Sequence, residues 1–285
     1  MTTWFLVVDK PAGLTSHDLV ARVRRATGVR RVGHAGTLDP MATGVVVVAV
    51  GGVTRLIRYI QDQDKEYEAT ALFGVATDTL DAEGEEIDRT PMTVTRAELE
   101  EIGRRFIGEI HQIPPMVSAL KRDGVRLYEL ARRGVEVERE ARPVVVRQLE
   151  FLSVSDDEYP SVTFRVVCGK GTYVRSLADD IARAAGGFAH LTALRRTRIG
   201  PFPVAHAIGV DALESWTDHL IPPVDALSFL PALEVDAETA KMVGNGRPIP
   251  VGSEDGSIRV LGPDGALLAV YSCADGTGRP EVVLG

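Results

Sequence analysis

The stretch Arg31-Val-Gly-His-Ala-Gly-Thr-Leu-Asp-Pro-Met-Ala-Thr-Gly44, followed at once by the apolar residues 45–50, decides the fold. Its glycines and its proline predict a tightly folded loop, because glycine permits positive φ angles and proline fixes its own φ. The run of valines that follows predicts a strand buried on both faces. Polar side chains on a loop held by a rigid strand are often catalytic, and this loop carries His34, Thr37, Asp39 and Thr43.

Asp39 is the candidate whose direction the sequence constrains most. Pro40 follows it, and the residue before a proline is pushed out of the helical region of φ/ψ space. We therefore expect the carboxylate of Asp39 to point in a fixed direction. The residues alone also allow a β-turn in which Asp39 binds only its own backbone, and for an arbitrary Leu-Asp-Pro that turn is the commoner case.

The string Gly33-His-Ala-Gly-Thr-Leu-Asp-Pro-Met-Ala-Thr-Gly44 resembles the signature of the TruB family of tRNA pseudouridine synthases. The match is long and ungapped. In that family the aspartate of Leu-Asp-Pro is the catalytic residue, so the resemblance implies this role for Asp39. It also makes His34 the candidate for a wedge beside a flipped base or for a phosphate contact, and a turn histidine without a role is the alternative.

Two shorter segments, Lys10-Pro-Ala-Gly13 and Lys65-Glu-Tyr67, match the same family. The first implies that Lys10 lies against the signature loop, although a lysine at a strand end is as often a plain surface residue. The second implies that Tyr67 lines the uracil pocket. Without the resemblance, a lone tyrosine in a strand would be assigned to packing.

The acidic segment Thr77-Asp-Thr-Leu-Asp-Ala-Glu-Gly84 has acids spaced somewhat as in a calcium loop. It lacks the glycine and glutamate positions of an EF-hand, so calcium binding is not expected. The segment matches the family pattern Thr-Asp-Thr-x-Asp-x-x-Gly. The resemblance implies that Asp81 helps to hold an arginine in the active site.

The segment Cys168-Gly-Lys-Gly-Thr-Tyr-Val-Arg-Ser-Leu-Ala-Asp-Asp180 predicts a glycine-containing turn that opens a helix near Tyr173. Such a turn can bind phosphate, but the spacing of a P-loop is missing. The resemblance implies that Arg175 pairs with the catalytic aspartate and that Tyr173 packs in the same pocket. A guanidinium suits this role, because it keeps a carboxylate ionised and fixes its direction. Further on, Leu194 matches a family leucine that walls the base pocket, although a leucine there is core in any fold.

The composition argues against a metal, a cofactor and a membrane. Cys168 and Cys273 form no disulfide framework and no metal-ligand spacing, which fits a reducing cytoplasm. The six histidines include no His-x-x-x-His pair, so we expect neither metal nor cofactor. The apolar residues 4–8 are too few for a signal peptide or a membrane span, and no later run reaches about 18 apolar residues. We expect a cytoplasmic monomer.

The net charge of −8 is confined to the end of the chain. Residues 1–210 hold 28 Lys+Arg and 28 Asp+Glu, whereas residues 211–285 hold 4 and 12. An RNA footprint needs clustered cations on one face, not a basic protein, so the charge leaves a local RNA site open. The candidate clusters, each of which is alone more typical of a solvated helix face, are Arg22, Arg24, Arg25, Arg30 and Arg31, then Arg55 and Arg58, then Arg195, Arg196 and Arg198.

The order of strand and helix patterns indicates an α+β chain. Ser16 is a good N-cap for a helix over residues 16–27 that Gly28 ends, and Thr95 with Glu98 forms a capping box for a helix over residues 95–107. Further predicted helices cover residues 52–60, residues 125–133 and the stretch after Tyr173. Strands are predicted over residues 4–9, 45–50, 64–73, 144–154 and 162–168. The resemblance implies a mixed, largely antiparallel sheet with flanking helices, and a mobile insertion around Tyr128-Glu-Leu-Ala-Arg-Arg-Gly134 that closes over bound RNA.

Three prolines in residues 221–231 interrupt the pattern and predict a boundary between a catalytic domain, 1–225, and a C-terminal domain, 231–285. Beyond it, short strands separated by glycine turns predict a small β-barrel. It resembles the PUA-type domain attached to TruB enzymes. Domains of this type usually contact RNA, but the acidic balance here argues against a large contribution.

The function implied is isomerisation of a T-arm uridine of tRNA, conventionally uridine-55, to pseudouridine. The base lies inside a folded RNA loop, so it must be flipped out of its stack before the chemistry. The residues alone also allow two other classes of protein. An RNA-binding or RNA-folding protein would not depend on Asp39, and a phosphate-binding transferase would need a nucleotide and a magnesium-binding carboxylate pair.

A first prediction follows from the absence of any spacing of Cys and His residues that is typical of a metal site. Protein stripped with EDTA and passed through gel filtration should convert a T-arm hairpin, folded in sodium chloride alone, as fast as untreated protein. Mass spectrometry of the hairpin measures the product. If zinc or magnesium restored a lost activity without changing the fold of the RNA, the expected absence of a metal would be wrong.

Overall fold

Strand β3 (Thr43–Val50) is the buried strand that the valine run predicts, since every residue from Gly44 to Val50 is buried. The computed structural model describes residues 3–116, 121–122, 125–126, 137–252 and 255–284. Its contacts form two units that do not follow the chain order. Unit 1 comprises Met1–Pro40, Gly44–Asp62 and Ile199–Gly285, and unit 2 comprises Met41–Thr43 and Gln63–Arg198.

The sheet of unit 1 is built around β3. Strand β1 (Trp4–Lys10) pairs antiparallel with β3, with Lys10 opposite Gly44, and β2 (Val32–His34) also pairs antiparallel with β3. Strand β14 (Ile208–Gly209) pairs parallel with β1. The register places Lys10 and the end of β2 at the two ends of the signature loop.

Helix α1 (Ser16–Thr27) ends at Gly28 as predicted, and this glycine adopts a left-handed φ of 68°. The predicted N-cap was one residue off. Thr15 caps the helix, because its hydroxyl accepts from the Asp18 amide while the Asp18 carboxylate accepts from the Thr15 amide. Ser16 is instead the first helical residue, and its hydroxyl binds the backbone of Leu38.

The remaining elements of unit 1 are short. The predicted helix over residues 52–60 begins as the 3-10 helix η1 (Gly51–Leu56), since two glycines weaken its start, and continues as α2 (Ile57–Gln61). The others are β13 (Phe202–Pro203), η3 (Val204–His206), η4 (Val210–His219) and α6 (Pro223–Ala226).

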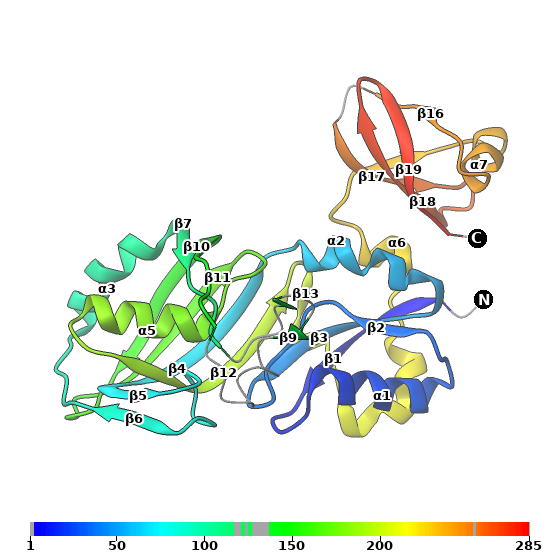
Figure 1. The fold of residues 1–285 in the computed structure, drawn as a ribbon. Coiled ribbons are helices and arrows are strands. Elements are labelled where there is room, and N and C mark those ends of the chain that lie inside the picture. The colour runs from blue at the N-terminus through cyan, green and yellow to red at the C-terminus, as the bar shows by residue number, and fades with distance from the viewer. Residues whose placement is uncertain (1–2, 117–120, 123–124, 127–136, 253–254, 285) are drawn as a thin grey trace. The chain divides into compact units, whose positions relative to one another are not determined.

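In unit 2 the strand order is β12-β4-β11-β10-β7, and the pairs β4–β11, β11–β10 and β10–β7 are antiparallel. Helices α3 (Arg96–Gly103) and α5 (Val174–Ala184) lie side by side over one face of these strands (Figure 1). The capping box of Thr95 and Glu98 is confirmed, but α3 ends before Ile107 and passes into η2 (Arg104–Phe106). The strands are β4 (Lys65–Phe73), β7 (Gly108–Gln112), β10 (Arg142–Val154), β11 (Ser161–Cys168) and β12 (Ala189–Ile199).

Two hairpins complete the described part of unit 2. One joins β5 (Val75–Thr77) to β6 (Glu86–Arg89), and the other joins β8 (Lys121–Arg122) to β9 (Val125–Arg126). Residues 125–126, predicted as the start of a helix, are therefore strand, because they pair with β8. The rest of that predicted helix and the insertion around Tyr128 lie outside the described residues.

The C-terminal region forms a small curled sheet in the order β15-β17-β18-β19-β16, with glycine turns between its strands (Figure 1). It has a core of its own, centred on the buried Val260 and Tyr271. The mixed, largely antiparallel α+β fold with a C-terminal β domain is thus confirmed. The elements are β15 (Ala232–Glu234), α7 (Ala237–Gly244), β16 (Ile249–Pro250), β17 (Gly256–Leu261), β18 (Leu267–Ala274) and β19 (Thr277–Val283).

The proline-containing segment before this sheet is packed, not extended. Ala226 and Leu227 are fully buried, in a core cluster that also contains Tyr59 of α2 and Val282 of β19. Arg259 of β17 donates to two backbone oxygens of this segment, those of Val224 at 2.8 Å and Leu230 at 2.9 Å. The boundary between domains 1–225 and 231–285 stays a prediction about the linear organisation of the chain.

The C-terminal sheet is also tied to α2 by polar contacts. The Tyr59 hydroxyl donates to Glu281 at 2.6 Å, and Arg58 lies 3.2 Å from the same carboxylate. Burial and the hydrogen bond to Glu281 raise the pKa of Tyr59 to about 12, so the hydroxyl keeps its proton at any physiological pH. Throughout the described ranges, no helix is both long and apolar enough to cross a membrane.

A second prediction concerns Asp180 on α5. Burial, and then the neighbouring charge of Asp179, raise the pKa of Asp180 to about 6, while Arg183 acts in the opposite direction. The folded protein therefore holds this proton more tightly than the unfolded chain. Ionisation of Asp180 therefore lowers the free energy of unfolding. This loss is absent well below pH 4, grows as the pH rises toward 6, and reaches its full size above pH 6.

Asp180→Asn should raise the midpoint of urea unfolding at pH 7.5, and the gain over wild type should shrink as the pH falls toward 4. Asp157→Asn, which alters an exposed acid, is the control and should change the midpoint little at either pH. A gain that is the same at pH 4 and pH 7.5 would contradict this account of Asp180.

Candidate active site

A buried lysine organises one end of the signature loop. Lys10, at the end of β1, is 0% exposed. Its Nζ donates to the backbone oxygens of Leu14 at 2.7 Å, Pro11 at 3.0 Å and Pro40 at 3.2 Å. A buried ammonium is tolerated only when such acceptors surround it, so the charge draws the Pro40 backbone against the turn that follows β1. The amide of Gly13 also donates to the Pro40 oxygen, at 2.9 Å.

The other side of Asp39 is held by the first turn of α1. The Ser16 hydroxyl accepts from the Leu38 amide at 2.9 Å and lies 3.3 Å from the Leu38 oxygen, to which it donates. The two residues that flank Asp39 are thus each bound through the backbone by a buried side chain. Asp39 itself is half-buried. Because the backbone on both sides of it is hydrogen-bonded, the orientation of its carboxylate is restricted.

His34 lies at the end of β2 and is half-buried. The His17 ring of α1 packs against it edge to face, with centroids 5.7 Å apart and an interplanar angle of 75°. Lys10, His34 and Asp39 therefore share unit 1, where β1, β2 and α1 meet the signature loop. Thr43, two residues beyond Met41, belongs to unit 2 and accepts from the Arg195 guanidinium at 3.2 Å.

In unit 2 the structure brings Asp81 and Arg175 together. Arg175 Nη1 lies 2.9 Å from Asp81 Oδ2, and the two side chains are only 3% and 5% exposed. The same guanidinium nitrogen donates to the Thr79 oxygen at 2.9 Å. The second carboxylate oxygen of Asp81 accepts from the Thr79 hydroxyl at 2.6 Å and from the Glu83 amide at 3.1 Å. The position of the Arg175 side chain is therefore fixed by the acidic loop, as the resemblance implies for Asp81.

The loop that carries Asp81 is strained. Leu80 has a φ of 61°, and a leucine in the left-handed region costs about 1–2 kcal/mol. The strained backbone is held by hydrogen bonds from the Leu191 amide to the Leu80 oxygen, at 3.0 Å, and from the Thr77 hydroxyl to the Asp81 oxygen, at 2.8 Å. Strain of this kind persists only where the surroundings determine the conformation, so the geometry around Arg175 is tightly specified.

The other predicted site residues of unit 2 lie on its sheet and on α5. Tyr67 on β4 is half-buried, opposite Val166 of β11, and Leu194 on β12 is buried. Tyr173 is the N-cap of α5. The buried Gln112 fixes its backbone, accepting from the Tyr173 amide at 3.0 Å and donating to its oxygen at 3.3 Å.

The arginine clusters are not equivalent. Arg196 is 1% exposed and so does not match the solvated face that the sequence allows, whereas the Arg198 side chain is 39% exposed and lies 3.2 Å from Glu66. The guanidinium of Arg31 donates to the Thr54 hydroxyl at 2.6 Å. On α1, Arg22 and Arg25 lie on the exposed face as predicted, and Arg30 in the loop after the helix is also exposed.

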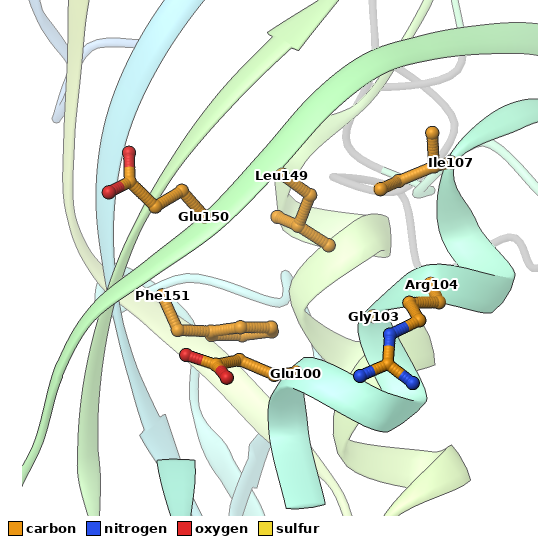
Figure 2. Close-up of a pocket in the computed structure, with 7 residues that line it drawn as sticks. All are labelled: Glu100, Gly103, Arg104, Ile107, Leu149, Glu150 and Phe151. Carbon is orange, nitrogen blue, oxygen red and sulfur yellow. The ribbon is translucent and has the colours of Figure 1, made fainter. Parts of the chain in front are cut away.

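A groove lies between α3 and β10 in unit 2 (Figure 2). Leu149 and Phe151 point from β10 toward α3, where Gly103 leaves room for the Phe151 ring. The charges on its rim are already paired, Glu100 with Arg96 at 2.8 Å and Glu150 with Arg165 at 3.3 Å. The groove therefore offers packing but no unused charge for catalysis. In the part of the chain that the structure describes, no cluster of His, Cys, Asp or Glu side chains could hold a metal ion.

Family models cover nearly the whole chain. Residues 24–174 match the TruB family pseudouridylate synthase N-terminal domain, residues 175–227 match the tRNA pseudouridylate synthase B C-terminal domain, and residues 230–285 match the tRNA pseudouridine synthase II C-terminal domain. The chain belongs to the TruB family. It is accordingly a pseudouridine synthase, an isomerase.

Relatives within the TruB family extend along the full chain. Proteins named tRNA pseudouridine synthase B are 44% identical in Burkholderia pseudomallei, 47% in Aromatoleum aromaticum and 44% in Thermobifida fusca. These matches cover 97%, 96% and 99% of this chain, and 95%, 89% and 99% of the relatives.

Solved structures share the fold over almost the whole chain. A Cbf5-Nop10-Gar1 complex contains a chain of 26% identity that aligns with a TM-score of 0.76, over 99% of this chain and 84% of that one. A chain of an H/ACA RNP bound to a substrate RNA containing 2'-deoxyuridine, at 24% identity, aligns with a TM-score of 0.75 over 99% and 85%.

Sequence reasoning missed the residues that hold the predicted site residues in place. Ser16 was assigned to a helix cap, and Gln112 and Thr79 were assigned no role. The sequence indicates these roles only weakly, because a single hydroxyl or amide side chain forms no motif with a recognisable spacing. A buried polar side chain must nevertheless find partners, and the burial of Gln112 becomes evident only in the structure.

A third prediction tests the Asp81–Arg175 pair. Asp81→Asn leaves a buried guanidinium uncompensated, and loss of one partner of a buried pair typically costs about 3–5 kcal/mol. We expect a fall of about that size in the free energy of unfolding, measured in urea. Glu100→Gln removes the same charge from an exposed pair, Arg96–Glu100, whose side chains are 53% and 49% exposed, and should cost less than about 0.5 kcal/mol. Equal losses in the two variants would refute a special role of the buried pair.

Proposed function

We propose that this pseudouridine synthase acts on tRNA, that its target is the T-arm uridine conventionally numbered 55, and that Asp39 is its catalytic residue. The observation that carries the proposal is the support of Asp39. Buried side chains bind the backbone of both its neighbours, Leu38 and Pro40. Such support is what a carboxylate needs to meet a reacting atom in one orientation. The tRNA substrate follows from the names of the full-length relatives.

The reaction needs little besides a placed carboxylate and a closed pocket. Uridine becomes pseudouridine when the N1–C1′ bond breaks, the uracil rotates, and C5 bonds to C1′. The proton on C5 leaves and N1 gains one, so the product is an isomer and no redox partner or energy source takes part. A carboxylate can serve by attacking C1′, by attacking the uracil ring, or by removing the C2′ proton.

The other matched residues take supporting roles in this proposal. Tyr67, Tyr173 and Leu194 supply aromatic and apolar surface for a base that must stay bound after it detaches. The family resemblance assigns Arg175 to the catalytic carboxylate, and Asp81, 2.9 Å from the Arg175 guanidinium, would hold that arginine in place. Exclusion of water favours isomerisation over the hydrolysis that paired carboxylates carry out in glycoside hydrolases.

RNA binding in this proposal depends on local charge. The exposed Arg22 and Arg25 lie on α1, whose first turn contacts the signature loop, and Arg30 follows the same helix. Neutralising phosphates in this way gives affinity that falls with salt. In this proposal the half-buried His34, at the end of β2, occupies the space of a base extruded from the T-loop stack.

A fourth prediction tests Asp39 directly. Asp39→Asn keeps the side-chain volume and removes the charge, so pseudouridine formation should fall by at least about 1,000-fold, roughly 4 kcal/mol of activation free energy. Affinity for tRNA should change by less than about threefold, because it rests on cations. Mass spectrometry of unmodified tRNA transcripts measures the product, and filter binding at fixed salt measures affinity.

Asp211→Asn, at an exposed acid outside the site, is the control and should be fully active. A hairpin with cytidine in place of uridine-55 should yield no pseudouridine. Near-normal turnover by Asp39→Asn would remove Asp39 from the mechanism. An active wild-type enzyme that modifies a different uridine would overturn the site specificity alone.

A further inference from the structure

Residues 15–18, at the start of α1, both cap the helix and contact the signature loop. Thr15 and Asp18 cap the helix, with Thr15 donating from its amide at 3.0 Å and Asp18 donating from its amide at 3.1 Å. Between them, Ser16 and His17 point at the signature loop, Ser16 to the Leu38 backbone and His17 to the His34 ring. The capped first turn of α1 therefore restrains the signature loop through Ser16 and His17.

We infer that Ser16 is a positioning residue for the catalytic carboxylate, acting through the backbone of Leu38. This inference rests on the proposed role of Asp39. Ser16 is 1% exposed and its hydroxyl engages both polar groups of Leu38, the amide at 2.9 Å and the oxygen at 3.3 Å. A single hydroxyl thus holds the residue before Asp39, while Lys10 and Gly13 hold the residue after it.

The two restraints act on different sides of Asp39 and cannot replace each other. The contacts of Lys10 and Gly13 fix the Pro40 oxygen, on the C-terminal side of Asp39, whereas the contacts of Ser16 fix Leu38 on its N-terminal side. Pro40 confines the backbone of Asp39 to extended conformations but does not choose among them. The Ser16 hydroxyl, which binds both polar groups of Leu38, contributes to that choice, so its loss should displace the carboxylate.

The expected size of the effect follows from two magnitudes. Loss of the hydroxyl leaves the buried Leu38 amide without this acceptor, which disfavours the observed loop conformation. A displacement of about 1 Å at a reacting group typically costs about 100-fold in rate. Ser16→Ala should therefore lower the single-turnover rate about 10- to 100-fold and change the affinity for tRNA by less than about threefold.

The chain supplies a matched control on the same helix. The Thr27 hydroxyl also bridges two backbone groups, donating to the Val23 oxygen at 2.8 Å and accepting from the Val29 amide at 3.3 Å. It does so at the opposite end of α1. Thr27→Val should destabilise the protein as Ser16→Ala does and leave the rate of folded enzyme unchanged, which separates positioning from stability.

The experiment combines kinetics with hydrogen exchange on the full-length protein. Single-turnover rates and filter binding are measured for wild type, Ser16→Ala, Ser16→Thr and Thr27→Val at a temperature where each is folded by circular dichroism. Amide exchange of Leu38 is followed by NMR. We expect faster exchange and a slow rate in Ser16→Ala, and near wild-type values of both in Ser16→Thr, which keeps the hydroxyl.

Several results would overturn the inference. These are an unchanged rate in Ser16→Ala, a loss in Ser16→Thr as large as in Ser16→Ala, or an equal loss in Thr27→Val. A weakened affinity with an unchanged rate would assign Ser16 to RNA binding and not to positioning. Failure of the proposed function is a separate result, because wild type would then make no pseudouridine, whereas exchange at Leu38 reports the contact whatever the reaction.

Discussion

The rest of the site depends on a positive charge that has been removed from water. Lys10 is fully buried, and the cost of burying an ammonium is offset only if oxygen atoms converge on it. Three backbone oxygens do so, and they belong to the turn after β1 and to the signature loop. The charge thereby joins two segments 30 residues apart. An apolar side chain of the same length would remove this donor from all three oxygens, and of these the Pro40 oxygen would keep the amide of Gly13.

Sequence patterns predicted many of the helices and strands, but few of the contacts that hold the signature loop. The valine run, the capping box at Thr95 and the glycine stop at Gly28 each express a local rule, and the structure has all three features. The cap of α1 was misplaced by one residue because Thr15 and Ser16 are both good caps. Tertiary contacts decide between them: Asp18 pairs with Thr15, and Leu38 engages Ser16.

The arginines show why charge patterns locate a site poorly. Arg195, Arg196 and Arg198 read as one basic patch in the sequence, yet Arg196 is buried and Arg198 is bonded to Glu66. Strand periodicity sends neighbours to opposite faces, so adjacent cations on β12 do not share a surface. On α1, by contrast, Arg22 and Arg25 are three residues apart and exposed on one face. The resemblance to a known family named the site residues, but the strained Leu80 and the bonds of Gln112 could be found only in the structure.

The interleaving of the two units sets an order of events during synthesis. Unit 2 takes its residues from an almost continuous stretch, Gln63–Arg198, whereas unit 1 needs both ends of the chain. Strand β1 gains its parallel neighbour, β14, only after residue 209 has left the ribosome. At about 5–20 residues per second, the first strand waits on the order of ten seconds for that partner. The middle of the polypeptide can therefore fold before β1 has gained its parallel neighbour.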